Sequence, residues 1–291
     1  MVSKPSRFDV VSVSYRHNSY CLSLVPDSVS MTPKPMHLLL TGLTGTFAPK
    51  VAARASHRNW QVSGWDRHRI PPEDADACHA YLTELRPDAI GHLALGAESW
   101  AGLLAAHAAD KGVPFVFTST AMVFDHEPDG PHAPADARTA KDDYGRYKIR
   151  CEDAVWAACP AATVVRIGWQ IDADKQGHAQ GNNMLAHLDA KQQRDGHIAA
   201  STLWRPACSF MDDTAEALLG LIEHPVAGPV HADSNAAEAH TFERIVRALK
   251  REFGREHWVI VADESYRHDQ RLVGGKVLMP GLSRRLEGLR E

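Results

Sequence analysis

An apolar strand that leads directly into a glycine turn is the feature that most constrains the fold of this chain. His37–Thr41 has the pattern of a short buried strand, and Gly45–His57 has the pattern of a helix. Glycines in such a turn let the backbone approach a phosphate closely, and the helix start supplies N–H groups and partial positive charge. The spacing GxxGxxA is weak by itself, but its position after an apolar strand strengthens it. We predict a pyrophosphate site formed by Gly42, Thr44, Gly45, Thr46 and Phe47.

Predicted strands and helices alternate along the chain from Met36. The predicted strands that follow are Gln61–Trp65, Ala89–Leu95, Val113–Thr118 and Thr163–Ile167. The predicted helices between them are Ala75–Leu85, Ser99–Asp110 and Tyr144–Ala158. Such alternation implies a parallel sheet with helices on both faces and right-handed crossovers. We therefore expect an α/β fold, a Rossmann-like doubly wound parallel sheet.

The alternation becomes looser after Gly168. Helices are predicted at Asn182–Asp189, Asp212–Glu223 and Phe242–Phe253, with a strand at His257–Val261. We interpret residues 36–168 as a dinucleotide-binding domain and residues 169–291 as a smaller substrate-binding lobe, some segments of which return to the first domain. Residues 1–35 end in a segment with two prolines and are interpreted as a flexible extension.

The composition narrows the classes of function. The formal net charge is −4 and the basic residues are scattered, which argues against a nucleic-acid surface. No apolar run approaches the roughly 20 residues that span a bilayer, so no membrane segment is expected. The five cysteines, an odd number without CxxC spacing, favour a reducing cytoplasm. The 17 histidines lack HExxH or paired spacing, so no metal site is predicted.

Asp66 and the arginines after it bear on the choice of nucleotide. Asp66 follows the second predicted strand, where a carboxylate can accept hydrogen bonds from the adenosine ribose of NAD. Arg67 and Arg69 could instead attract the 2′-phosphate of NADP. Both Asp66 and Arg67 are therefore predicted cofactor residues, and the choice between NAD and NADP stays open.

Tyr144 and Lys148 form the candidate catalytic pair. Four residues apart on a helix, they share one face, and a lysine ammonium beside a phenol is expected to lower the pKa of that phenol. Tyr144 is then the predicted general acid for protonating a carbonyl oxygen. Thr120 follows the apolar strand that precedes this helix and is predicted to donate a hydrogen bond to the same oxygen.

Together these segments resemble the extended short-chain dehydrogenase/reductase family. Met36–Gly42 is similar to that family's opening strand, and Leu85–Ala94 is similar to its "RPD…HLA" strand, which passes beside the nicotinamide ribose and adds Leu93 and Ala94 to the cofactor site. Within the family, the likeness is greatest to dTDP-4-dehydrorhamnose reductases and related sugar-nucleotide enzymes. That likeness rests on Ser119–Asp125, Tyr144–Lys148 with Glu152, Val165–Trp169, Gly181–Met184 and Asp212–Ala215.

The resemblance implies an NAD- or NADP-dependent reductase of a keto-sugar, with a nucleotide sugar as its small-molecule partner. It carries the family's catalytic roles onto Thr120, Tyr144 and Lys148, and it gives Tyr144 and Lys148 contacts with the cofactor as well. A cytoplasmic homodimer is a further expectation. Substrate contacts are expected beside the threonine and in the smaller lobe, from Ala121, Met122, Asn182, Asn183 and Arg205.

Three departures from the family pattern leave alternatives open. Ala121-Met122 stands where the family has Asp-Tyr, the connection from Ala94 to Lys111 is short, and no asparagine lies between Asn59 and Asn182. One alternative is an epimerase or dehydratase that retains NAD, although a dehydratase would need an acidic pair beside the threonine. The other is a dinucleotide-binding subunit without catalysis, like the regulatory subunit of methionine adenosyltransferase. The intact triad argues against that reading, and the shortened loop argues for it.

Overall fold

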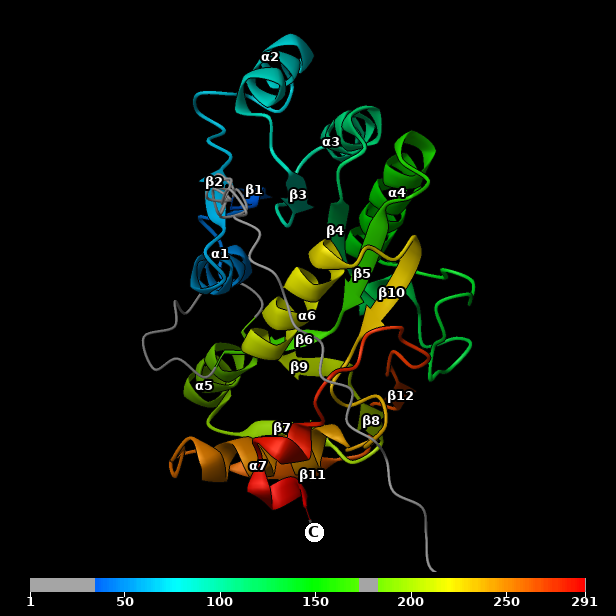
Figure 1. Ribbon diagram of the computed structural model, residues 1–291. Helices are drawn as coiled ribbons and strands as arrows, with labels where there is room; N and C mark the ends of the chain where they lie inside the picture. Colours follow the sequence, from blue (N-terminus) through cyan, green and yellow to red (C-terminus); the bar gives the residue numbers. More distant parts are fainter. Residues whose placement is uncertain (1–34, 173–182, 291) are drawn as a thin grey trace, which may run out of the picture. The chain divides into compact units, whose positions relative to one another are not determined.

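The computed structural model describes residues 35–172 and 183–290 (Figure 1). Residues 35–291 group as one unit by their contacts. The predicted extension at residues 1–35 lies almost entirely outside the described residues, as does Asn182. Within the described ranges, no helix combines the length and apolar character needed to cross a membrane.

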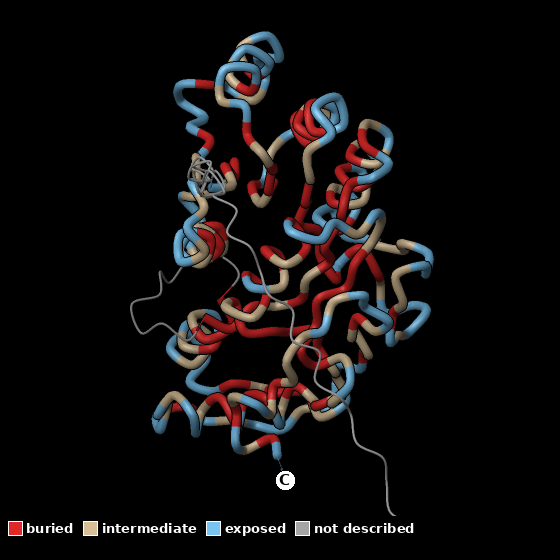
Figure 2. Tube along the Cα trace, viewed as in Figure 1, coloured by how far each residue is buried: buried red, intermediate tan, exposed pale blue. Residues whose placement is uncertain are grey.

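A six-stranded parallel sheet is the centre of the fold, in the order β10-β5-β4-β3-β1-β2. Its strands are built from short apolar runs. Strands β1, β3 and β4 are buried along their whole length (Figure 2), because both faces of a parallel sheet are covered. The strand order reverses between β1 and β3, which places a ligand crevice at the carboxyl ends of these strands. The strands are β1 His37–Thr41, β2 Gln61–Gly64, β3 Ala89–His92, β4 Phe115–Thr120, β5 Thr163–Ile167 and β10 Gly228–Ala232.

Helices cover the two faces of this sheet. Helices α1 and α6 pack on one face around a core that includes Val51 and Leu218, and α2, α3 and α4 pack on the other around Leu82 and Leu104. Their bounds are α1 Phe47–His57, α2 Ala75–Leu85, α3 Glu98–Lys111, α4 Asp143–Ala158 and α6 Met211–Glu223. Helix α6 and strand β10 come from beyond residue 168 and complete the sheet layer. The predicted doubly wound fold is confirmed.

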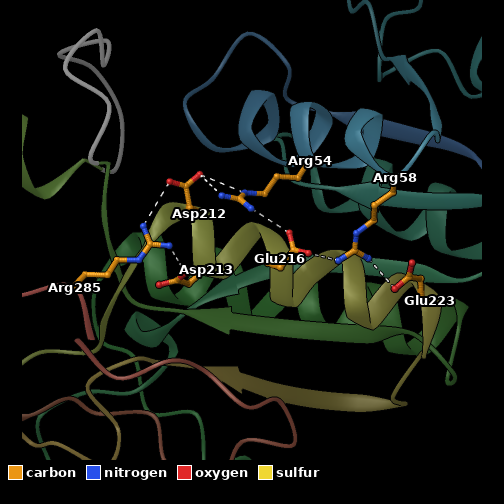
Figure 3. A network of polar contacts seen from close by, with 7 residues as sticks. All are labelled: Arg54, Arg58, Asp212, Asp213, Glu216, Glu223 and Arg285. Carbon is orange, nitrogen blue, oxygen red and sulfur yellow. Dashed lines mark hydrogen bonds and ion pairs between the residues drawn. The ribbon is translucent and has the colours of Figure 1, made fainter. Parts of the chain in front are cut away.

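A row of charged side chains joins the exposed sides of α1 and α6 (Figure 3). Arg54 Nη2 lies 3.0 Å from Asp212 Oδ1, and Arg58 bridges Glu216 and Glu223. The Arg58 hydrogen bond holds the pKa of Glu216 below its usual value. Exposed ion pairs contribute little to stability. These ion pairs instead hold α1, the helix that follows the glycine turn, against α6, which comes from the second half of the chain.

The remaining elements form smaller pairings with a core of their own. Parallel strand pairs join β6 to β9, β7 to β11 and β8 to β12, and buried Leu188, Leu249 and Trp258 pack together. The bounds are β6 Trp169–Ile171, β7 Ile198–Ser201, β8 Trp204–Arg205, β9 Cys208–Phe210, β11 Ile260–Asp263, β12 His268–Asp269, α5 Met184–Asp195, α7 Phe242–Glu252, and the 3-10 turns η1 Ala121–Val123, η2 Leu282–Arg284 and η3 Glu287–Leu289. The division of the chain at residue 168 stays a prediction.

Several predicted boundaries are wrong, for physical reasons that the structure shows. The third strand ends at His92 rather than Leu95, because the N–H groups of Leu93 and Ala94 bind Thr41 Oγ1 instead of a neighbouring strand. Helix α5 begins at Met184 and continues to Asp195, where Gly196 ends it with a φ of +72°. The strand predicted at His257–Val261 starts only at Ile260, because Trp258 lies in a turn and is buried in the smaller core.

Candidate active site

One pocket of about 830 Å³ lies at the carboxyl ends of the sheet strands. It contains all the residues predicted to bind the cofactor or to carry catalysis. Those residues are Gly42, Thr44, Gly45, Thr46, Phe47, Asp66, Arg67, Leu93, Ala94, Thr120, Tyr144 and Lys148. The structure therefore brings together side chains from β1 through α4. A pocket of this size is within the range of small-molecule and cofactor sites.

The phosphate end of the pocket is built by the turn between β1 and α1. Gly42 has a φ of +89°, and a Cβ there would lie 3.2 Å from the Ala94 backbone nitrogen. Gly45 N donates to Gly42 O over 2.9 Å and closes the turn. Helix α1 begins without a side-chain cap and has no acidic residue in its first turn. Its N-terminal N–H groups and partial positive charge therefore favour an anion at this end.

Thr41 and His92 position the segment after β3, which lies against the glycine turn. Thr41 Oγ1 accepts hydrogen bonds from Leu93 N and Ala94 N, at 3.0 and 3.1 Å, and lies 2.8 Å from His92 Nδ1. Burial lowers the pKa of His92 to about 3, so the ring is neutral. Because both lone pairs of the hydroxyl already accept the two backbone N–H groups, its hydrogen is donated to Nδ1, and the ring proton lies on Nε2. The sequence identified the strand but not this contact.

The adenosine end lies beyond β2. Asp66 Oδ1 accepts from His68 N at 2.9 Å within a turn, and its carboxylate lines the pocket. The Arg67 guanidinium lies 4.8 Å from the centre of the Trp100 ring and donates to Leu95 O. Arg69 does not line the pocket, which leaves Arg67 as the nearer of the two candidate partners for a 2′-phosphate.

The catalytic candidates meet where β4 ends and α4 begins. Asp142 caps α4 by accepting from Gly145 N, which places Tyr144 in the first turn and Lys148 one turn later. A Cβ on Gly145 would lie 2.2 Å from Met122 O, so only glycine lets the helix approach the turn after Thr120 this closely. Thr120 Oγ1 accepts from Met122 N over 3.2 Å and keeps its own hydrogen for donation.

Lys148 is the buried charge of the site. Its side chain is 3% exposed, its Nζ donates to Thr118 O at 2.9 Å, and it lies 4.7 Å from the centre of the Phe117 ring. Burial lowers its pKa to about 8. A protein interior disfavours an isolated ammonium, and the single carbonyl and the aromatic face offset only part of that cost.

The prediction that Lys148 lowers the pKa of Tyr144 is wrong for this structure. Desolvation of the phenol raises the pKa of Tyr144 above its usual value, although 40% of the residue is exposed, and the Asp142 carboxylate acts in the same direction. The Lys148 ammonium is directed to Thr118 O instead. The phenol therefore keeps its proton at neutral pH, which suits a proton donor rather than a proton acceptor.

The described residues predicted to bind substrate do not line the pocket. Ala121 and Met122 form the turn η1 just beyond Thr120, where Ala121 is buried and Met122 is 39% exposed. Asn183 is buried and caps α5 by accepting from Leu185 N at 3.1 Å. Arg205 lies on β8. Their roles toward a substrate stay predictions, and Asn182 lies outside the described residues.

Sequence reasoning missed several lining residues. Ser119 and Gln170 are buried polar side chains at the catalytic end, and Met211 lies at the start of α6. Ser119 begins the Ser119–Asp125 segment but has no predicted role there, and no motif signals Gln170, because β6 is positioned by its pairing with β9. Within residues 35–172 and 183–290, no cluster of three or more histidine, cysteine or acidic side chains could hold a metal ion.

Comparison with known proteins gives a family match over most of the chain. Residues 36–252 match the family described as the RmlD substrate binding domain. A probable dTDP-4,6-dihydroxy-2-methyloxan-3-one 4-ketoreductase of Streptomyces antibioticus is 26% identical over 241 residues, which cover 76% of this chain and 79% of that protein.

Solved structures of low sequence identity share the fold. A dTDP-4-dehydrorhamnose reductase of Bacillus anthracis in complex with NADP has a TM-score of 0.72 at 14% identity, covering 87% of this chain and 97% of the other. The Bordetella bronchiseptica enzyme WbmH in complex with NAD+ has a TM-score of 0.66 at 15% identity, covering 87% and 96%. The family match and these likenesses confirm the predicted resemblance and the predicted fold.

Proposed function

The chain belongs to the family of the RmlD substrate binding domain, and from this premise we propose that it reduces the keto group of a nucleotide-linked sugar with NADH or NADPH. One observation carries the proposal. A single pocket holds both an anion-binding turn at Gly42–Gly45 and three groups suited to carbonyl reduction, at Thr120, Tyr144 and Lys148. The ketoreductase named for a relative 26% identical to this chain is of the same reaction class.

The order of the strands supports one orientation of a bound dinucleotide. Asp66 follows β2, the glycine turn follows β1, and Leu93 and Ala94 follow β3, which neighbours β4. The adenosine ribose, the pyrophosphate and the nicotinamide ribose would meet these segments in that sequence. The nicotinamide would then lie at the ends of β4 and β5, where Thr120 pairs with Ile167 in register.

The bound cofactor supplies hydride, and the chain's own residues bind and protonate the carbonyl. Thr120 donates its free hydroxyl hydrogen to the carbonyl oxygen and orients it. Tyr144 donates the proton, since its raised pKa keeps the phenol protonated near neutral pH. Lys148, charged below about pH 8, stabilises the negative charge that develops on the oxygen and on the phenol.

The turn η1 bears on the competing functions. Ala121 and Met122 provide no acidic pair beside Thr120, so the elimination step of a dehydratase lacks its acid and base. An epimerase that retains NAD uses the same three groups and differs in its net reaction. A subunit without catalysis would bind the dinucleotide and leave the sugar unchanged.

A cofactor-consumption assay separates these functions. Purified protein is mixed with NADH or NADPH and a panel of dTDP-linked 4-keto-sugars, and both cofactor oxidation and the sugar product are followed. A reductase consumes one cofactor for each sugar reduced. Sugar inversion without net consumption identifies the epimerase, and binding without any turnover identifies the subunit. Either of those two results would contradict the proposal.

A further inference from the structure

Two polar atoms at the catalytic end of the pocket have no hydrogen-bond partner within the described part of the chain. They are Ser119 Oγ and Gln170 Oε1, on side chains that are 3% and 1% exposed. Both residues line the pocket. A buried polar atom without a partner is costly, and most such atoms in native proteins are paired. The group that fills the pocket is therefore the natural source of partners for these two atoms.

The free atom of Gln170 is the carbonyl oxygen. Its other terminal atom, Nε2, donates to Gly168 O at 3.1 Å. Because Gly168 O can only accept, the amide nitrogen must face it, and the oxygen must be the atom left over. The terminal torsion of a glutamine is soft, so this oxygen can turn toward a bound group while the backbone stays in place.

The backbone holds both residues firmly at the same end of the pocket. Ser119 lies within β4 and pairs with Arg166 of β5, one residue before Thr120. Gln170 lies in β6, where it pairs with Ser209 of β9 and forms an isolated bridge with Asn183. The phosphate turn follows β1, which is separated from β4 by β3. These atoms thus lie at the Tyr144 end of the pocket.

We propose that Ser119 and Gln170 bind the carboxamide of the nicotinamide ring and so set which face of the ring meets the substrate. The Gln170 carbonyl accepts from the amide N–H2, and the Ser119 hydroxyl donates to the amide oxygen. A primary carboxamide offers one strong acceptor and one donor group side by side, which matches a free acceptor and a free donor. The assignment rests on the proposed NAD(P)-dependent function.

The neutral character of the two groups supports a neutral ligand. Neither side chain is charged, and a carboxylate would meet the Gln170 carbonyl with two oxygens and no hydrogen. The Lys148 ammonium and the neutral phenol of Tyr144 already serve the reacting oxygen in the proposed function. A ring that carries an amide is therefore favoured over the corresponding acid or methyl ketone.

Calorimetric binding with three ligands tests the proposal without any turnover. The ligands are NAD+ or NADP+, whichever the wild type binds more tightly, its 3-acetylpyridine analogue, and the matching ADP-ribose, which lacks the ring. The acetyl group keeps the carbonyl oxygen but replaces the amide nitrogen by a methyl group. Ser119→Ala and Gln170→Met are compared with Ser234→Ala, which removes a buried unpartnered hydroxyl outside the pocket.

Each variant has a distinct expected pattern. Gln170→Met weakens the parent dinucleotide about threefold to tenfold, the loss typical of one neutral hydrogen bond, and leaves the acetylpyridine analogue unchanged. Ser119→Ala weakens both of these ligands to a similar extent, because both keep the oxygen. Neither variant changes ADP-ribose binding, and Ser234→Ala changes none of the three. Thermal unfolding checks that the variants are folded.

The outcomes separate this proposal from the proposed function. If the wild type binds ADP-ribose and does not distinguish the amide from the acetyl ring, the carboxamide assignment is overturned while the dinucleotide site remains. The assignment is also overturned if Gln170→Met weakens ADP-ribose as much as the parent ligand. If the wild type binds none of the three ligands, the NAD(P)-dependent function itself fails.

Discussion

The two ends of the pocket differ in how well the sequence predicted them. All the residues predicted for the phosphate end line the pocket, whereas none of the described residues predicted to bind substrate lines it. Gly42, Gly45 and their neighbours form the wall beneath α1. By contrast, Asn183 is a buried helix cap, and Ala121 is a buried residue of the turn η1 after Thr120.

The difference has a physical origin in the range of the interactions. The phosphate turn depends on a positive φ at one glycine and on the start of the next helix, and both are local properties of a few residues. At the other end, Gln170 of β6 and Met211 of α6 line the pocket, and β6 reaches it through parallel pairing with β9, a segment about 40 residues away in the chain. A local motif cannot report which of these side chains face the pocket.

Removing the Tyr144 hydroxyl tests the catalytic end most strongly. Tyr144→Phe keeps the ring and its packing, and we expect kcat to fall by about 10²–10⁴, the usual contribution of general acid catalysis. The dissociation constant for the cofactor should stay within about twofold, because the hydroxyl is assigned to the reacting oxygen. Single-turnover rates and calorimetry measure the two effects. A variant that turns over substrate at the wild-type rate would require a different acid.

Blocking the phosphate turn tests the other end. A Cβ on Gly45 meets only Gly42 O, at 3.3 Å, and this position lacks the positive φ of Gly42, so Gly45→Val should fold. Its side chain would occupy the approach of the pyrophosphate, and we expect NAD(P) affinity to fall at least about 100-fold. Gly220→Ala on α6, where a Cβ meets nothing within 4 Å, is the control. Unchanged affinity in the folded Gly45 variant would refute the phosphate assignment.

The buried lysine predicts opposite pH trends for activity and stability. Burial lowers the pKa of Lys148 to about 8, whereas an unfolded lysine titrates near 10.4. As pH rises above about 8, the folded protein loses this charge, and kcat/KM for the free enzyme should fall about tenfold per pH unit. Over the same range the unfolded state binds more protons, so the free energy of unfolding should rise.

Lys148→Met supplies the control for that comparison. It removes the titrating group, so both the activity slope and the stability slope between about pH 8 and 10.4 should disappear. Urea unfolding and initial-rate profiles across this range measure them. If both slopes persist in the variant, another group titrates there, and the charge of Lys148 is not the one that supports reduction.

How much the sequence predicted depends on whether a feature is local. The alternation of strands and helices, the glycine turn and the four-residue spacing of Tyr144 and Lys148 follow from patterns within single elements, and the structure contains them. Partial desolvation raises the pKa of Tyr144, which is 40% exposed, and Lys148 is directed to Thr118 O, so residue spacing alone suggested the wrong direction. Gln170 lies in a strand of three residues, too short for any periodicity to detect.

Asn183 offers the finest test of the difference between the two ends. The side chain accepts hydrogen bonds from Leu185 N at 3.1 Å and Asp172 N at 3.4 Å, and it is buried. Asn183→Ala removes the oxygen that caps α5, so we expect the free energy of unfolding to fall by about 1 kcal/mol, a typical cost of losing a helix cap. Asn183→Ser keeps a capping oxygen and should recover most of that loss. In both variants KM for the sugar should stay unchanged.

For Arg205 we expect the opposite result, an effect on substrate binding without an effect on stability. The structure places Arg205 on β8, where it pairs with Asp269 of β12, and its guanidinium suits the diphosphate of a nucleotide sugar. Arg205→Met should raise KM severalfold and leave urea unfolding unchanged. If instead Asn183→Ala raises KM at constant stability while Arg205→Met destabilises the fold, the two roles are exchanged. The start of α5 would then belong to the substrate site. In that case a local feature of the sequence, a helix cap, would have predicted a substrate residue, and the two ends of the pocket would differ less than the described residues indicate.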